Sequence, residues 1–207
     1  MVYDMEAIFI SAASQYSNES RFINQLWQEI ELAYHDKTRY YHTMKHLHHL
    51  YDELLQVKQN IKDWDTILFS IFYHDIFYSP LRKDNELKSA ELARTRLESI
   101  HLPAKQIEKC AKMILATKDH TASDDEDINF FTDADLSILG TNRPVYIEYF
   151  QGVKKEYAAL PGIIYKAGRK SVLQQFLKMS SIFKTEHFYH KYEKAARENI
   201  NYELNTI

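Results

Sequence analysis

The stretch from Ile67 to Ile76 most constrains what this chain can fold into, because it is apolar almost throughout yet contains two adjacent polar residues near its end, His74 and Asp75. A helix that is apolar on nearly every side is typical of a buried core element. Imidazole and carboxylate groups that lose their water need strong partners, and a metal ion is one such partner. The sequence therefore predicts a helical core organised around His74 and Asp75.

Composition favours one all-α domain. Glycine and proline number only 4 each in 207 residues, which leaves little turn chemistry for an all-β fold. Hydrophobic residues make up 45% of the chain and charged residues 27%, as in a soluble globular protein. A chain of this length can bury one large core. We expect a single helical bundle over residues 1–207.

Charge and cysteine usage exclude several classes of partner and compartment. The formal net charge of −3 gives no overall attraction to a nucleic-acid polymer or an anionic membrane, so we expect neither as a partner. The single cysteine, Cys110, cannot form an internal disulfide, which indicates a reducing compartment. Residues Met1–Glu6 carry two acids and no basic residue, unlike a secretory signal, and no apolar run approaches the ~20 residues needed to cross a bilayer. A cytoplasmic protein is expected.

Apolar residues spaced by three and four predict a series of helices. Residues 20–34 show the clearest stripe, and residues 3–15 a weaker one. Capping and breaking residues set the limits of the others. Helices are expected to begin near Tyr41, after Asp63, after Asp84, at Pro103, near Phe130 (ending at Gly140), at Pro144, after Pro161-Gly162, and near Glu186 (ending about Leu204).

Three polar clusters lie beside these apolar helices and predict a metal site. They are Tyr41–His46, His74-Asp75 and Phe131–Leu136. His42 and His46 are four residues apart, so on a helix they share one face.

The predicted ligands are His46, His74, Asp75 and Asp135. They supply two nitrogens and two oxygens from three helices, a donor set that suits a divalent ion of the Mn, Fe, Ni, Co, Zn or Mg type. A catalytic site also keeps one position open for water or substrate, and the combination suits hydrolysis.

Further motifs accompany these clusters in a fixed order. The set is Arg39-x-Tyr41-His42-x-x-x-His46, His74-Asp75-x-x-Tyr78, Asp84-Asn85-Glu86-x-x-Ser89-Ala90, Ala116-Thr117-x-x-His120, Asp133-Ala134-Asp135-Leu136-x-Ile138-Leu139-Gly140, Glu156-Tyr157 and Gly168-Arg169. Over about residues 20–205 the chain resembles the HD superfamily of metal-dependent phosphohydrolases, in particular a poorly characterised bacterial branch. The resemblance implies an all-α HD-type domain that hydrolyses a phosphate mono- or diester, such as a nucleotide.

A more distant similarity connects the chain to the cyclic nucleotide phosphodiesterases, through Tyr41-His42-x-x-x-His46 and Ala134-Asp135-Leu136-Ser137. This similarity implies that His46 is a metal ligand and His42 the general acid. It also selects Asp135 over Asp133 as a ligand and leaves Asp133 to support the ligands, to cap a helix or to hold a second ion. Thr43 replaces an asparagine of that family, and no glutamine and aromatic clamp for a cyclic nucleotide base is recognisable, so the similarity does not extend to that substrate.

Hydrolysis assigns roles to other residues. Asp75 can reach both the ion and the attacking water, so it joins His42 as a catalytic residue. We expect a small phosphorylated substrate, with Arg39, Lys118 and Arg169 as candidates to hold its phosphate. For Arg169 the alternative is an ion pair with Glu156 or another acid.

Three residues near these clusters have two interpretations each. Asp84 is expected to cap a helix, with a second metal site as the alternative. Glu86 fits equally a first-turn acid and a group that contacts the substrate, orients water or holds a second ion. His120 follows a helix end and is expected to cap the last carbonyls, with a second metal as the alternative.

Two other function classes fit the same residues. In a non-catalytic helical module the ion would lock three helices together or sense a ligand. On the same scaffold an iron oxygenase is also consistent with the donor set, because a fold does not fix a reaction. Assembly as a homodimer is compatible with every class.

Overall fold

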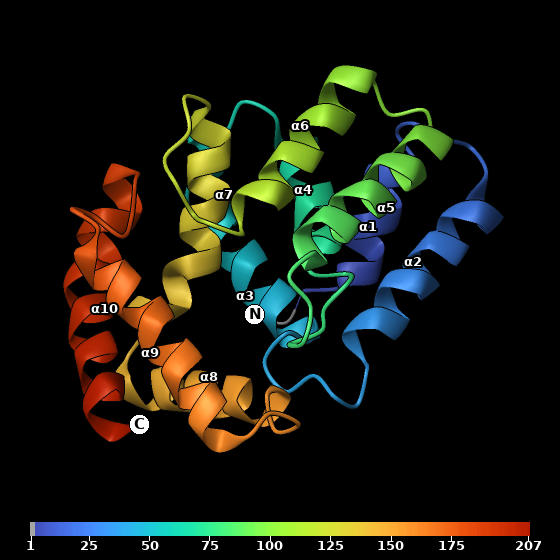
Figure 1. Ribbon diagram of the computed structural model, residues 1–207. Helices are drawn as coiled ribbons and strands as arrows, with labels where there is room; N and C mark the ends of the chain where they lie inside the picture. The colour runs from blue at the N-terminus through green and yellow to red at the C-terminus, as the bar shows by residue number, and fades with distance from the viewer. Residues whose placement is uncertain (1–2) are drawn as a thin grey trace.

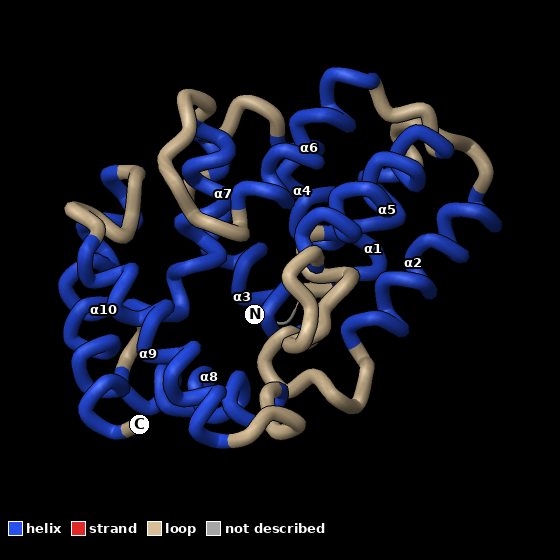
Figure 2. Tube along the Cα trace, in the orientation of Figure 1, coloured by secondary structure: helices blue, strands red, loops and turns tan. Residues whose placement is uncertain are grey.

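The computed structural model describes residues 3–207, and within that range the chain is all helical, with no strand (Figure 2). The all-α prediction is confirmed. The α-helices are α1 (Met5–Ala13), α2 (Ser20–Tyr34), α3 (Met44–Leu55), α4 (Trp64–Tyr73), α5 (Asn85–Ser99), α6 (Ala104–Ala116), α7 (Glu126–Leu136), α8 (Arg143–Glu156), α9 (Gly162–Lys178) and α10 (Glu186–Thr206), and two short 3₁₀ helices are η1 (Lys58–Asn60) and η2 (Ser137–Gly140).

The helices form two groups around a central set (Figure 1). Helices α3, α4 and α7 lie in the middle, with α3 packed against both of the others. On one side α1 and α2 pack together, and α5 packs against α6. On the other side α8, α9 and α10 gather, shown in orange to red in Figure 1, with α9 packed against α10. The central set therefore lies between the group of α1, α2, α5 and α6 and the group of α8, α9 and α10.

Helix α4 is the core element that the sequence predicts. Its side chains from Thr66 to Tyr73 are all buried, and burying each large apolar one contributes roughly 1.5–3 kcal/mol. Asp63 caps the helix as expected, because its carboxylate accepts a hydrogen bond from the Thr66 amide at 3.1 Å. The helix ends at Tyr73, so His74 follows directly from the core and is itself 1% exposed.

Helix α3 begins at Met44 and not at Tyr41, which corrects one prediction. His42 therefore lies in the loop before the helix and does not share a helix face with His46. The amides of residues 40–42 donate instead to the carboxylate of Glu156, an interaction that holds these residues outside the helix. The two imidazole rings are still close, with centroids 5.8 Å apart.

Gly140 is needed for close packing, and helix α7 ends before it and not at it as the sequence predicts. Helix α7 ends at Leu136, η2 continues to Gly140, and no described glycine has a positive φ. A Cβ atom at position 140 would lie 2.5 Å from the Cβ of Tyr192, which belongs to α10. Glycine therefore lets η2 and α10 approach each other.

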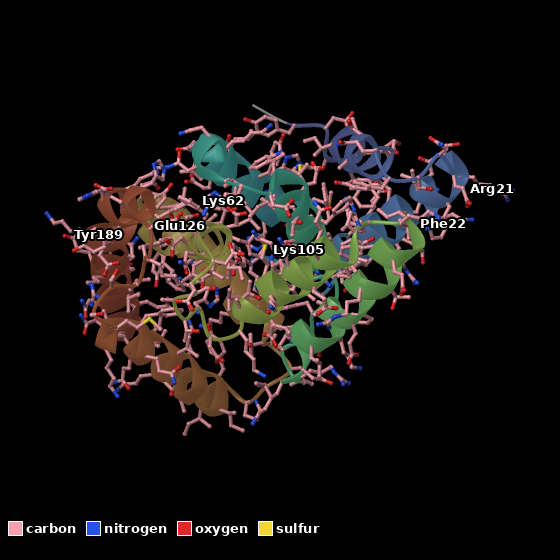
Figure 3. All side chains as sticks on the ribbon, turned by 90° about the horizontal axis from the view of Figure 1, so that it is seen from above. Arg21, Phe22, Lys62, Lys105, Glu126 and Tyr189 are labelled. Atoms are coloured by element: carbon pink, nitrogen blue, oxygen red, sulfur yellow. The ribbon has the colours of Figure 1, made fainter. Side chains whose placement is uncertain are left out.

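Charged side chains project from the helices into solvent (Figure 3). Lys62 and Glu126, both labelled in Figure 3, form an exposed ion pair with 3.7 Å between Nζ and Oε2. Such pairs contribute little to stability because water screens them. Between residues 3 and 207, no helix has both the length and the apolar character required to cross a membrane.

Candidate metal centre

His46, His74 and Asp75 converge where α3 and the end of α4 meet. One possible ligand atom from each lies within 4.8 Å of the other two. The two Nε2 atoms of His46 and His74 are 3.0 Å apart, and Oδ2 of Asp75 is 3.2 Å from Nε2 of His74 and 3.8 Å from Nε2 of His46. Three side chains that could hold a metal thus point at one small volume.

Asp135, on α7, approaches the same volume. Its Oδ1 atom lies 3.3 Å from Nε2 of His46 and 4.0 Å from Nε2 of His74. Two ligand atoms that each lie about 2.1 Å from an ion are about 3.0 Å apart at a right angle and about 3.4 Å apart at a tetrahedral angle. The shortest separations in the cluster of His46, His74, Asp75 and Asp135, hereafter the His-Asp cluster, have these values. The donor set therefore fits a divalent ion.

The tautomer of His74 is fixed by the backbone. Its Nδ1 atom donates to the carbonyl oxygen of Ile71 over 2.9 Å, in the turn where α4 ends. A carbonyl oxygen can only accept, so the proton sits on Nδ1 and the lone pair of neutral His74 is on Nε2. A second hydrogen bond of this kind is the usual support of a metal-binding histidine.

The charges in the His-Asp cluster favour the binding of a cation. Burial lowers the pKa of His46, which keeps this ring neutral at pH 7. Burial also opposes charge on His74, but the carboxylates of Asp75 and Asp135 outweigh it and raise the pKa of His74 to about 9. Burial would raise the pKa values of the two carboxyl groups, yet the neighbouring histidines hold both pKa values well below the usual range. Both carboxylates are therefore charged, and a bound ion would displace the proton of His74.

His120 contacts Asp135 and does not cap a helix with its side chain, which corrects the expected role. Its Nε2 atom lies 2.9 Å from Oδ2 of Asp135, the oxygen next to the one that faces His46. The residue has a positive φ of 50°, an uncommon conformation that turns the chain after α6. His120 thereby orients a member of the His-Asp cluster.

His42 faces the cluster from the loop before α3. Its Nδ1 atom is 2.8 Å from Oε2 of Glu156, and its Nε2 atom is 3.9 Å from Oδ2 of Asp75. The ring stacks on Tyr78, with centroids 3.9 Å apart. Because the carboxylate accepts from Nδ1, Nε2 is the ring atom that faces Asp75.

Glu156 holds this arrangement from the end of α8. Oε1 accepts from three consecutive amides, those of residues 40–42, and Oε2 accepts from His42 and from the hydroxyl of Tyr78 at 2.8 Å. Burial would raise the pKa of Glu156, but these donors outweigh it and lower the pKa to about 2. The side chain is therefore a buried carboxylate with both oxygens fully used.

A cavity of about 520 Å³ opens beside the His-Asp cluster. Several predicted site residues line it, namely His42, Asp75, Glu86, Lys118, His120, Asp135 and Arg169. Arg39, Asp84 and Asp133 are not among its lining residues. The cavity brings most of the predicted catalytic and substrate-binding side chains to one surface.

Arg39 is a structural residue, which corrects its assignment to the substrate phosphate. It is 8% exposed, and its guanidinium donates to the carbonyl oxygens of Asp75 at 2.8 Å and Ile76 at 2.9 Å. It also lies over the ring of Tyr34, 5.0 Å from the centroid. Arg39 therefore fixes the chain that follows α4.

The carboxylates of Asp133 and Asp84 are also paired with other groups of the chain. The buried carboxylate of Asp133 accepts from the amides of Lys184 and Thr185 and from both of their side chains, so it anchors the segment that enters α10. Asp84 precedes α5 as expected, but its carboxylate pairs with Arg82 and makes no capping bond. Neither residue is placed to hold a second ion in the cavity.

Arg169 lines the cavity and is paired with Glu203, which agrees with the alternative of an ion pair with Glu156 or another acid. Its Nε atom lies 2.8 Å from Oε1 of Glu203, which is fully buried on α10. Lys118 is exposed, and its ammonium donates to the carbonyl of Lys83 at 3.1 Å. Of these two cations, Lys118 is the one with no carboxylate partner among the described residues.

Sequence reasoning did not assign the functions of Glu156 and Tyr78. Both belong to motifs that the resemblance contains, but no spacing pattern connects Glu156 to His42 across 114 positions. The signal that could have found Glu156 is its place on the helix, because it follows Phe150 and Val153 at intervals of three and an acid on that apolar face needs a partner.

Comparison of the chain with protein-family models, with curated proteins and with solved structures gives no match.

Proposed function

We propose that this chain is a metal-dependent hydrolase of a phosphate mono- or diester and a member of the HD superfamily. One observation carries the proposal: the His-Asp cluster, which fits a divalent ion, lies beside a cavity into which His42 also projects. A structural ion is enclosed by side chains, whereas a catalytic ion keeps a position open to water or substrate. The cavity beside the cluster supports a catalytic ion.

The roles of the residues follow from their contacts. A divalent ion in the cluster would lower the pKa of a coordinated water toward ~7 and polarise a phosphoryl oxygen. Asp75 lies 3.9 Å from His42 across the edge of the cavity, so its carboxylate is positioned to orient the attacking water. His42, in its protonated form, donates from Nε2 to the departing oxygen while Glu156 holds Nδ1.

The remaining lining residues provide for the phosphate. Lys118 offers an ammonium group near the cluster without a carboxylate partner of its own, and we assign it to a phosphate oxygen. Glu86 lines the same cavity and carries no hydrogen bond from its side chain among the described residues. Its carboxylate is free to accept from a substrate hydroxyl or a water.

A panel of phosphate mono- and diesters tests the proposal, assayed with Mn, Mg, Co, Ni, Zn and Fe(II) and after chelation. We expect metal-dependent turnover of at least one ester, loss of that turnover in His42→Ala, and unchanged metal content in the variant. No turnover of any phosphate compound, with the ion closed off by protein side chains, would instead favour the non-catalytic module. Oxygen consumption with Fe(II) and no hydrolysis would favour the oxygenase.

A further inference from the structure

The cavity beside the His-Asp cluster has two chemically different halves. The first is formed by the end of α4, the chain that enters α5, the end of α6 and α7, and its charged or ionisable members include Asp75, Arg82, Glu86, Lys118, His120 and Asp135. The second is formed by α8, α9 and the loop between them, and its main members are Tyr149, Leu160, Ile164, Tyr165, Val172 and Phe176. The first half offers charged and polar groups to a ligand, and the second offers apolar surface.

The apolar half begins next to the cluster. The ring of Tyr41 lies 5.0 Å from the ring of His46 and 4.6 Å from that of Tyr149, measured between centroids. On the other side His120 lies 6.3 Å from the ring of Phe176. A molecule whose phosphate is held at the cluster would therefore reach the apolar half with the group next to that phosphate.

The apolar half carries no net charge. Arg169 is its single charged lining residue within the described chain, and the buried carboxylate of Glu203 neutralises it. The hydroxyls of Tyr41 and Tyr165, both on residues of the cavity wall, have no hydrogen-bond partner between residues 3 and 207. An uncharged group with apolar faces fits these surroundings.

Gly168 leaves space in this wall. Ile164, Gly168 and Val172 follow each other at intervals of four on α9 and all line the cavity, so they form one stripe. A glycine inside a helix costs about 1 kcal/mol relative to alanine, and no close neighbour requires it, because a Cβ atom at position 168 would meet nothing within 4 Å. Ile164 and Val172 are 54% and 43% exposed, so this stripe presents apolar surface that is open to contact.

We propose that the substrate is a phosphate ester with an uncharged, largely apolar ring group, and that this group binds against α8 and α9 over Gly168. The inference rests on the proposed function for the phosphate end. It adds the chemical class of the other end and names Gly168 as the residue that sets the size limit. A substrate with only a small alkyl group would leave the apolar half in contact with water and would bind more weakly.

Calorimetric binding of two phosphonates to the Mn²⁺-loaded full chain tests this. Benzylphosphonate and methylphosphonate differ in the ring, and neither is hydrolysed, so the result does not depend on turnover. We expect benzylphosphonate to bind at least about tenfold more tightly than methylphosphonate, from the apolar area that it buries. In Gly168→Leu the affinity for benzylphosphonate should fall about tenfold, while that for methylphosphonate stays within about twofold.

Gly162→Leu is the matched control, because position 162 is also on α9 and unobstructed but does not line the cavity. Both affinities should be unchanged in this variant, and both variants should unfold at or above the wild-type temperature. Equal affinities of the two phosphonates for the wild type overturn the inference, as does a Gly168→Leu variant that binds benzylphosphonate as well as the wild type or loses both ligands alike. Selective phosphonate binding without hydrolysis of any ester would refute the proposed function alone, and the apolar half would then stand as a binding site for the ring group and not as a substrate site.

Discussion

The imidazole of His42 and the carboxylate of Glu156 are joined by a hydrogen bond of 2.8 Å that connects the loop before α3 to the end of α8. The same carboxylate accepts from the amides of residues 40–42, so one buried acid fixes both the backbone and the ring of His42. This leaves Nε2 of the ring facing Asp75 at the edge of the cavity. Glu156 is therefore a positioning residue for the proposed general acid.

Replacement of Glu156 by glutamine should lower kcat by about 10- to 100-fold and change KM little, since glutamine has no charge and one acceptor oxygen in place of two, while the cavity wall stays intact. Steady-state kinetics on the best ester of the panel, with metal content measured in parallel, checks this. Glu186→Gln is the control, because the Glu186 side chain is 90% exposed and lies outside the cavity. A kcat equal to that of the wild type would show that Glu156 does not position His42.

Glu156 should also make stability depend on pH. Its pKa falls from 4.5 to about 2 on folding, so its contribution is complete well above pH 4.5 and is lost as pH falls from there toward 2. The difference in free energy of unfolding between the wild type and Glu156→Gln should therefore narrow by about 2 kcal/mol between pH 6 and pH 3. Urea denaturation of both proteins at the two pH values measures it. A difference that stays constant over this range would mean that the folded protein does not hold Glu156 as a stabilised carboxylate.

His120→Ala should weaken metal binding by about 10- to 100-fold without unfolding the protein, since His120 orients Asp135 through a bond of 2.9 Å. Competition with a chelator of known affinity gives the dissociation constant. His190→Ala is the matched control, because the side chain of His190 is 70% exposed on α10. Equal affinities of the two variants would show that His120 does not support the metal centre.

Arg39→Lys should reduce the free energy of unfolding by about 2 kcal/mol, because a single ammonium cannot reproduce the forked contacts to the carbonyls of Asp75 and Ile76. Arg94→Lys should leave stability nearly unchanged, since Arg94 pairs with Glu108 at the surface. Thermal and urea unfolding of the two variants check this. If Arg39→Lys instead kept full stability and raised KM alone, the sequence-based assignment of Arg39 to the substrate would be restored.

Local patterns were sufficient for the helices and for the centre of the site. The stripe over residues 20–34 coincides with α2, and the apolar run after Asp63 forms the buried α4. His74 and Asp75 could be placed because an imidazole and a carboxylate that directly follow a core helix lose water and need strong partners nearby. His46 could be placed with them because it lies on the same buried face of α3 as Leu50 and Leu54.

Contacts between remote segments could not be predicted in the same way. Glu156 lies 114 positions from His42, and no periodicity in the sequence connects the two residues. The sequence therefore could not show that the Glu156 carboxylate binds the amides before Met44 and that α3 begins only at Met44. Arg39 looked like a phosphate ligand because its charge is visible in the sequence, whereas the carbonyls that it binds become available only when α4 ends beside it. The contact of His120 with Asp135 depends on a left-handed backbone residue after α6 that its sequence context does not signal.

The proposed function requires the His-Asp cluster to bind a divalent ion that keeps an exchangeable water. Water-proton relaxation during titration with Mn²⁺ measures binding and water access together. We predict a saturable enhancement at one ion per chain for the wild type and for His42→Ala, and its loss in Asp75→Asn. No saturable enhancement in the wild type, or an equal enhancement in Asp75→Asn, would contradict the proposal.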